Sequence, residues 1–178
     1  GMIHPLRHFT IKGVIWYQGE SNNNAPATYK RLMQALVADW RDGFKSDLSF
    51  YYVQIAPFTY KGNAALLREQ QLQALSIPNS GMVVTSDISN LKDIHPKNKQ
   101  EVGRRLALQA LANDYGMKVI CDGPRLKQMD IKASKAILYF EHFLCTLLAP
   151  SIVQESTLYC TGGTKPSIVF FEKTRKSF

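Results

Sequence analysis

The stretch IKGVIWYQGESN, residues 11–22, is the part of the sequence that decides the fold. Its first eight residues are rich in β-branched and aromatic side chains and stop at Gly19, a pattern that predicts a buried strand. A polar run from Ser21 to Asn24 is expected to form a loop, and Pro26 suits the first turn of a helix. The stretch therefore predicts a strand that leads into a helix.

Two more strand–helix pairs follow the first. Apolar side chains recur at steps of three and four from Tyr29 to Trp40, which predicts a helix that ends at Gly43. Further strands are expected over residues 48–55 and 82–85, and further helices over residues 64–76, capped by Asn63, and 98–115. In the helix over residues 64–76, the side chains expected to face inward are Leu66, Leu67, Leu72 and Leu75. This order predicts an α/β fold, a parallel sheet with flanking helices, whose site lies at the carboxyl ends of the strands.

The pattern changes after Gly116. Extended segments are expected over residues 126–131 and 136–140, which would form a hairpin, and over residues 167–171. We therefore expect an α/β domain over residues 2–121 and a β-rich C-terminal extension over residues 122–178. Within the extension the pattern diverges after residue 143.

The chain of 178 residues carries 22 Lys and Arg against 14 Asp and Glu, a formal net charge of +8. The excess is spread along the chain and is densest at residues 173–176, so we expect a solvated surface and no nucleic-acid partner. No run of 18 apolar residues occurs, so no membrane span is expected. Residues 1–5 show no signal-peptide pattern, and the compartment stays unknown.

Polar groups able to do chemistry gather directly after the first strand. Gly19 permits a tight turn, and beside it stand the amide of Gln18 and the carboxylate of Glu20. An amide can donate to a developing oxyanion, and a carboxylate can orient a histidine. The same loop holds the Ser21 hydroxyl and the Asn22 amide. These groups could instead cap the next helix, so the pattern alone leaves both interpretations open.

A second set of polar groups lies in the loop before the third helix. Asp93 and His95 are two apart in an extended segment and so point to the same side. A histidine there could serve as a general base whose tautomer a carboxylate holds, although Asp93 could equally cap a turn beside an ordinary surface histidine. The four histidines show no ligand spacing with carboxylates, so no metal or other cofactor is expected.

The segments that hold these groups resemble a known family. Residues 2–6 (MIHPL) and 11–22 resemble the central signature of sialate O-acetylesterases, and residues 93–108 (DIHPKNKQEVGRRLAL) resemble their histidine block. The resemblance covers residues 2–142. It implies a flavodoxin-like SGNH hydrolase fold and a serine carbohydrate esterase that removes acetyl groups from an acetylated carbohydrate substrate.

The resemblance also implies roles for individual residues. His95 would be the catalytic base, and Gln18 would supply the side-chain oxyanion donor on the turn that Gly19 shapes. The acid partner would be Asp93 or Glu20, with neither preferred. Family members are often secreted or periplasmic.

The sequence departs from the family at the nucleophile. The family's serine lies in an N-terminal G-Q-S-N-like block that has no counterpart in these residues, and Ser21 aligns with the oxyanion block. We therefore expect an N-terminally truncated domain, weak or inactive as an esterase, that forms a homo-oligomer over an exposed sheet edge. The alternative is a non-catalytic carbohydrate-binding or structural remnant that stacks sugars on Trp16, Tyr17 and residues 50–52.

Overall fold

A computed structural model describes residues 2–132, 135–141, 159–160 and 167–171. The chain forms two compact units, Gly1–Cys121 and Asp122–Phe178. Each unit has its own sheet.

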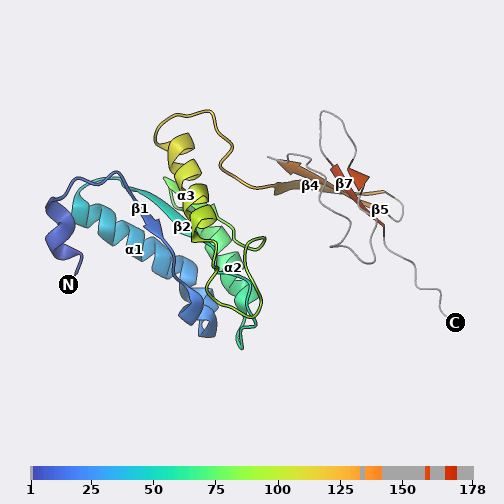
Figure 1. The fold of residues 1–178 in the computed structure, drawn as a ribbon, viewed down its shortest axis with the longest axis horizontal. Helices are drawn as coiled ribbons and strands as arrows, with labels where there is room; N and C mark the ends of the chain where they lie inside the picture. Colours follow the sequence, from blue (N-terminus) through green and yellow to red (C-terminus); the bar gives the residue numbers. More distant parts are fainter. Residues whose placement is uncertain (1, 133–134, 142–158, 161–166, 172–178) are drawn as a thin grey trace. The chain divides into compact units, whose positions relative to one another are not determined.

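The first unit is built on a three-stranded parallel sheet (Figure 1). Its strands are β1 (Gly13–Trp16), β2 (Ser49–Val53) and β3 (Ser80–Val83), in the order β1-β2-β3. Ile15 pairs with Tyr51, and Tyr52 pairs with Met82. The predicted α/β class and the parallel sheet are confirmed. Strands β1 and β2 are shorter than the runs that indicated them, and β3 begins and ends two residues before the predicted strand over residues 82–85.

Helices connect the strands at the predicted places. They are α1 (Tyr29–Phe44), α2 (Ala64–Gln73) and α3 (Lys99–Asn113), with 3-10 turns η1 (His4–His8), η2 (Glu20–Asn24), η3 (Pro26–Thr28) and η4 (Ala74–Ser76). Asn63 caps α2 by accepting a hydrogen bond from the Leu66 backbone N at 2.9 Å, as expected. The predicted end of α1 at Gly43 is wrong. Lys45 instead takes the left-handed conformation, with φ of 51°, after the helix.

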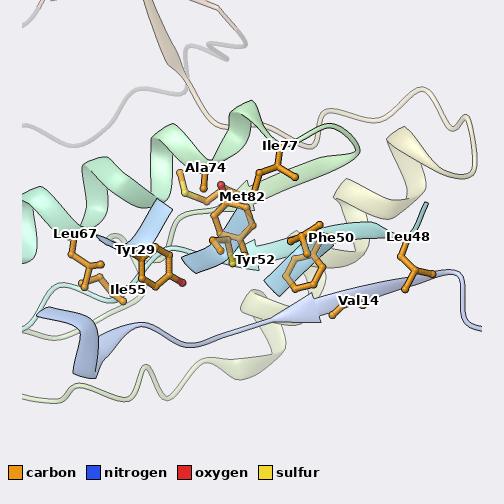
Figure 2. Close-up of a cluster of buried hydrophobic side chains, with 12 residues drawn as sticks. Val14, Tyr29, Leu48, Phe50, Tyr52, Ile55, Leu67, Ala74, Ile77 and Met82 are labelled. Atoms are coloured by element: carbon orange, nitrogen blue, oxygen red, sulfur yellow. The ribbon is translucent and has the colours of Figure 1, made fainter. Parts of the chain in front are cut away.

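The two faces of the sheet bury different side chains, because successive residues of a strand point to opposite faces. Phe50 and Tyr52 pack with Tyr29 of α1 and Leu67 of α2 in the larger core (Figure 2). On the other face, side chains of α3 cover Tyr51 and Val53. Leu72, expected to face inward, is 51% exposed. Its place on α2 turns away from the core that Leu67 enters, so that expectation is wrong.

Strand β1 forms one edge of this sheet. Ile15 in its middle is 71% exposed, although its cross-strand neighbour Tyr51 is buried. An apolar side chain beside an open strand edge favours association, but self-association stays a prediction. In the part of the chain that the structure describes, no helix is long and apolar enough to cross a membrane.

The second unit holds an antiparallel sheet. Its strands are β4 (Arg125–Lys132), β5 (Lys135–Glu141), β6 (Tyr159–Cys160) and β7 (Ser167–Phe171), in the order β4-β5-β7-β6. The predicted hairpin is confirmed by the pairing of β4 with β5, and the strand expected over residues 167–171 is β7. Most residues after 143 lie outside the described residues, so their divergence stays a prediction.

Candidate active site

The carboxyl ends of β1, β2 and β3 meet at one edge of the parallel sheet, where α/β proteins place their sites. The loop after β1 holds Gln18 to Asn22. The loop after β2 leads through Phe58 and Tyr60 to α2. The loop after β3 runs to Asn98, the cap of α3, and holds Asp93 and His95.

The loop after β1 presents the Gln18 amide in a fixed orientation. Gln18 Nε2 donates to Asn22 Oδ1 at 2.9 Å, while the Gln18 carbonyl accepts a hydrogen bond from the Tyr29 hydroxyl at 2.9 Å. Because an amide nitrogen carries two N–H groups, one donor of Gln18 stays available to a ligand. The Gln18 side chain is exposed, so a substrate oxygen can reach it.

Gly19 shapes this turn, as expected. Its φ of 149° lies in the region that L side chains rarely adopt. A Cβ there would lie 3.2 Å from each of Gln71 Nε2, Ile55 Cγ2 and Tyr29 Cε2. The backbone of the loop after β1 therefore sits directly on the core.

Gln71 of α2 forms part of the core surface on which Gly19 lies, although sequence reasoning did not single it out. Its side chain is fully buried, and Gln71 Oε1 accepts a hydrogen bond from the Ile55 backbone N at 3.0 Å. Its backbone carbonyl accepts from the Tyr52 hydroxyl at 2.7 Å. The available signal in the sequence is a polar residue on the apolar face of a helix. Such a residue indicates a buried side chain with hydrogen-bond partners, because buried amides are nearly always hydrogen-bonded.

Asp93 and His95 lie side by side in the loop after β3, but their side chains are not hydrogen-bonded. Asp93 Oδ1 accepts a hydrogen bond from the His95 backbone N at 3.0 Å and lies 3.9 Å from His95 Nδ1. The second distance exceeds that of a hydrogen bond. The His95 side chain is 83% exposed. Asp93 therefore caps the turn and keeps its carboxylate within a small side-chain rotation of the imidazole.

Arg105 of α3 anchors the start of the same loop. It donates to the Val84 carbonyl at 2.6 Å, to Asp87 Oδ1 at 2.7 Å and, through Nε, to Glu101 Oε1 at 2.8 Å. The Arg105 guanidinium lowers the pKa of Asp87, and hydrogen bonds from Arg104 and then Arg105 lower the pKa of Glu101 to about 2. This network ties the loop that carries His95 to a helix.

The network predicts a pH-dependent stability. A carboxyl whose pKa is lowered in the folded state stabilises it above the unfolded pKa, 4.5 for Glu101, and this stabilisation is lost as the pH falls toward 2. Urea unfolding at pH 7 and pH 3 should show this decline, and it should be shallower in Arg105→Gln. At pH 7 we expect Arg105→Gln to lower the free energy of unfolding by about 1–3 kcal/mol.

Arg104→Gln is the matched control at pH 7, because Arg104 is exposed and bonds Glu101 but does not reach the loop. Exposed pairs of this kind contribute little to stability, so Arg104→Gln should lower the free energy of unfolding less than Arg105→Gln does. Equal losses in both variants at pH 7 would contradict the anchoring role of Arg105.

One contact links the residues that flank the loop after β1 and the loop after β3. Lys99 Nζ, four residues after His95, lies 4.9 Å from the centre of the Tyr17 ring, which precedes Gln18. Burial raises the pKa of Tyr17. Among the described residues, no hydrogen bond or ion pair links His95 to Gln18, Glu20 or Ser21. The structure therefore brings the loops together without forming a His95–Glu20 pair.

The aromatic side chains named for sugar stacking are mostly core. Phe50, Tyr51 and Tyr52 are each less than 5% exposed, and Trp16 packs against Trp40 with ring centres 6.0 Å apart. Within the described ranges, no three His, Cys, Asp or Glu side chains are grouped as metal ligands would be.

Comparisons with known proteins agree on one group of relatives. A protein-family model described as "Carbohydrate esterase, sialic acid-specific acetylesterase" matches residues 2–112. The sialate O-acetylesterase of Mus musculus is 34% identical over 165 residues, covering 77% of this chain and 30% of the mouse protein. That of Homo sapiens is 33% identical over 177 residues, covering 80% of this chain and 32% of the human protein.

A solved structure is similar as well. The crystal structure of a carbohydrate acetylesterase from Xanthomonas citri superimposes with a TM-score of 0.76 and 33% identity, covering 96% of this chain and 44% of that one. The chain thus spans about a third of the length of the curated relatives and under half of the solved one.

Proposed function

Because this chain belongs to the carbohydrate esterase family of sialic acid-specific acetylesterases, we propose that it contributes to the removal of acetyl groups from sugar hydroxyls. The observation that carries the proposal is the placing of the Gln18 amide and the His95 imidazole on loops at the same edge of the sheet. The substrate is an acetylated carbohydrate.

In the proposed reaction His95 is the general base. Its imidazole takes the proton of a serine hydroxyl, whose oxygen attacks the acetyl carbonyl. The free N–H of Gln18 donates to the oxyanion that forms, and Gly19 keeps that donor in place. The imidazolium then gives its proton to the sugar oxygen as the ester bond breaks. Water, activated by His95, cleaves the acetyl-serine ester and releases acetate.

The serine is proposed to come from the family's G-Q-S-N-like block, which these residues do not include. The 178-residue chain should therefore hydrolyse p-nitrophenyl acetate no faster than its His95→Ala variant, measured by release of p-nitrophenol. Activity that disappears in both His95→Ala and Ser21→Ala would identify Ser21 as the nucleophile and overturn this part of the proposal.

Asp93 is proposed as the acid partner of His95, ahead of Glu20. Its carboxylate lies 3.9 Å from the imidazole, while Glu20 makes no ion pair in the described part of the chain. The test uses the chain fused behind a family segment that carries the G-Q-S-N-like block, called the serine-joined protein below. Asp93→Asn should lower kcat by about 10²-fold or more.

Asparagine can still accept the bond from the His95 backbone N, so the turn should persist in that variant. Glu20→Gln serves as the comparison and should change kcat by less than about tenfold. The reverse ranking of the two variants would move the acid role to Glu20.

A further inference from the structure

Arg68, on α2, has an unsatisfied guanidinium. Its Nε is buried and has no hydrogen-bond partner among the described residues. Its side chain makes one hydrogen bond, from Nη2 to the Ala56 carbonyl, at the long distance of 3.5 Å. Desolvating an N–H of a charged group without a partner is costly, so a guanidinium kept only for structure would be expected to hold better bonds. This position points to a ligand.

Tyr60 meets Arg68 at the same acceptor. The Tyr60 hydroxyl donates to the Ala56 carbonyl at 3.3 Å, also a weak bond. The Tyr60 ring stands edge-to-face against Phe58, with centres 5.2 Å apart and planes at 77°. Both rings are only partly buried. The loop after β2 therefore offers an aromatic surface with a hydroxyl and a guanidinium beside it.

Glu20 belongs to the loop that packs against the loop of Tyr60. A Cβ on Gly62 would lie 2.4 Å from Asn23 Nδ2, so the loops that carry Tyr60 and Glu20 pack directly on each other. Burial raises the pKa of Tyr60 to about 12, the negative charge of Glu20 adds to the rise and the positive charge of Arg68 opposes it. Both charges thus act on one hydroxyl, yet no ion pair joins them within the described ranges.

We infer that Arg68, Tyr60 and Glu20 form a subsite for the hydroxyls of a neutral sugar ring, which lies against the Phe58–Tyr60 pair. This inference rests on the proposed function, since it locates the sugar in the same site. Arg68 donates to one ring oxygen, and Glu20 accepts from a neighbouring hydroxyl, as a pair of vicinal hydroxyls requires. A carboxylate gains no net attraction there, because Glu20 repels it as Arg68 attracts it, so a neutral ring is preferred.

The test is a calorimetric or NMR titration of the 178-residue chain with unacetylated xylotetraose, a neutral sugar. Arg68→Lys keeps the charge and removes the planar fork, and Tyr60→Phe keeps the ring and removes the hydroxyl. We expect each to raise Kd by about fivefold or more. Glu69→Gln, the exposed neighbour of Arg68 on α2, is the matched control and should bind as the wild type does.

Three results would overturn the inference: no xylotetraose binding, an unchanged Kd in both variants, or tighter binding of N-acetylneuraminic acid, which carries a carboxylate. If Arg68→Lys fails to fold, as judged by thermal melting, Tyr60→Phe decides alone. Hydrolysis of p-nitrophenyl acetate by the serine-joined protein reports separately on the proposed function, because that ester contains no sugar. If the serine-joined protein does not hydrolyse p-nitrophenyl acetate, the esterase proposal is contradicted. The sugar titration still decides whether the subsite exists.

Discussion

Replacing His95 by alanine in the serine-joined protein is expected to lower kcat/KM for an acetylated sugar by about 10²–10⁴-fold. The imidazole has two tasks, which are to take the serine proton and to give it to the departing sugar oxygen. The loss should be smaller for p-nitrophenyl acetate, whose phenolate departs without a proton. Steady-state hydrolysis of both esters by the same preparation measures this difference directly.

The variant should fold as the wild type does, because the bond to Asp93 Oδ1 comes from the backbone N of residue 95 and survives in alanine. His8→Ala is the matched control, since His8 is an exposed histidine on η1, and it should keep full activity. Wild-type activity in His95→Ala would remove the proposed base. Equal losses for the two esters would remove its role as proton donor to the sugar.

Much of the fold could be predicted from local patterns. Runs rich in β-branched or aromatic residues indicate the strands of the parallel sheet, and the Asn63 cap of α2 accepts the expected backbone N–H bond. Asn98, predicted as the start of the third helix, caps α3 in the same way. The alternation of strands and helices then leaves few topologies. The ends of elements were less predictable, since the close of α1 depends on a left-handed Lys45 and not on Gly43.

The site could be predicted only where its residues are close in sequence. Gln18 with Gly19, and Asp93 with His95, are local pairs, so their patterns are visible in the chain. Arg68 and Tyr60 meet at the Ala56 carbonyl through the return of α2 over the sheet, and no sequence period shows such a contact. The 3.9 Å gap between Asp93 and His95 is likewise a property of the turn.

Gly19→Ala is expected to lower the free energy of unfolding by about 2–4 kcal/mol. One part of the loss is the φ of 149°, which an L residue adopts at a cost of about 1–3 kcal/mol. The other is crowding, because the new Cβ meets Gln71, Ile55 and Tyr29 at 3.2 Å, and all three residues are fully or nearly fully buried. Urea unfolding at pH 7 measures the sum.

Gly103→Ala makes the same chemical change and should shift the free energy of unfolding in the opposite direction. Gly103 lies within α3, and beyond the adjoining backbone of the helix no atom of the described residues would lie within 4 Å of a Cβ there. Alanine is the better helix former by about 1 kcal/mol, so this variant should be more stable than the wild type. If Gly19→Ala were instead as stable as the wild type, the turn would be able to change its backbone conformation without a loss of stability. The Gln18 amide would then lack the rigid support on which its proposed role as oxyanion donor depends, since a donor that must reorganise during the reaction stabilises the oxyanion less.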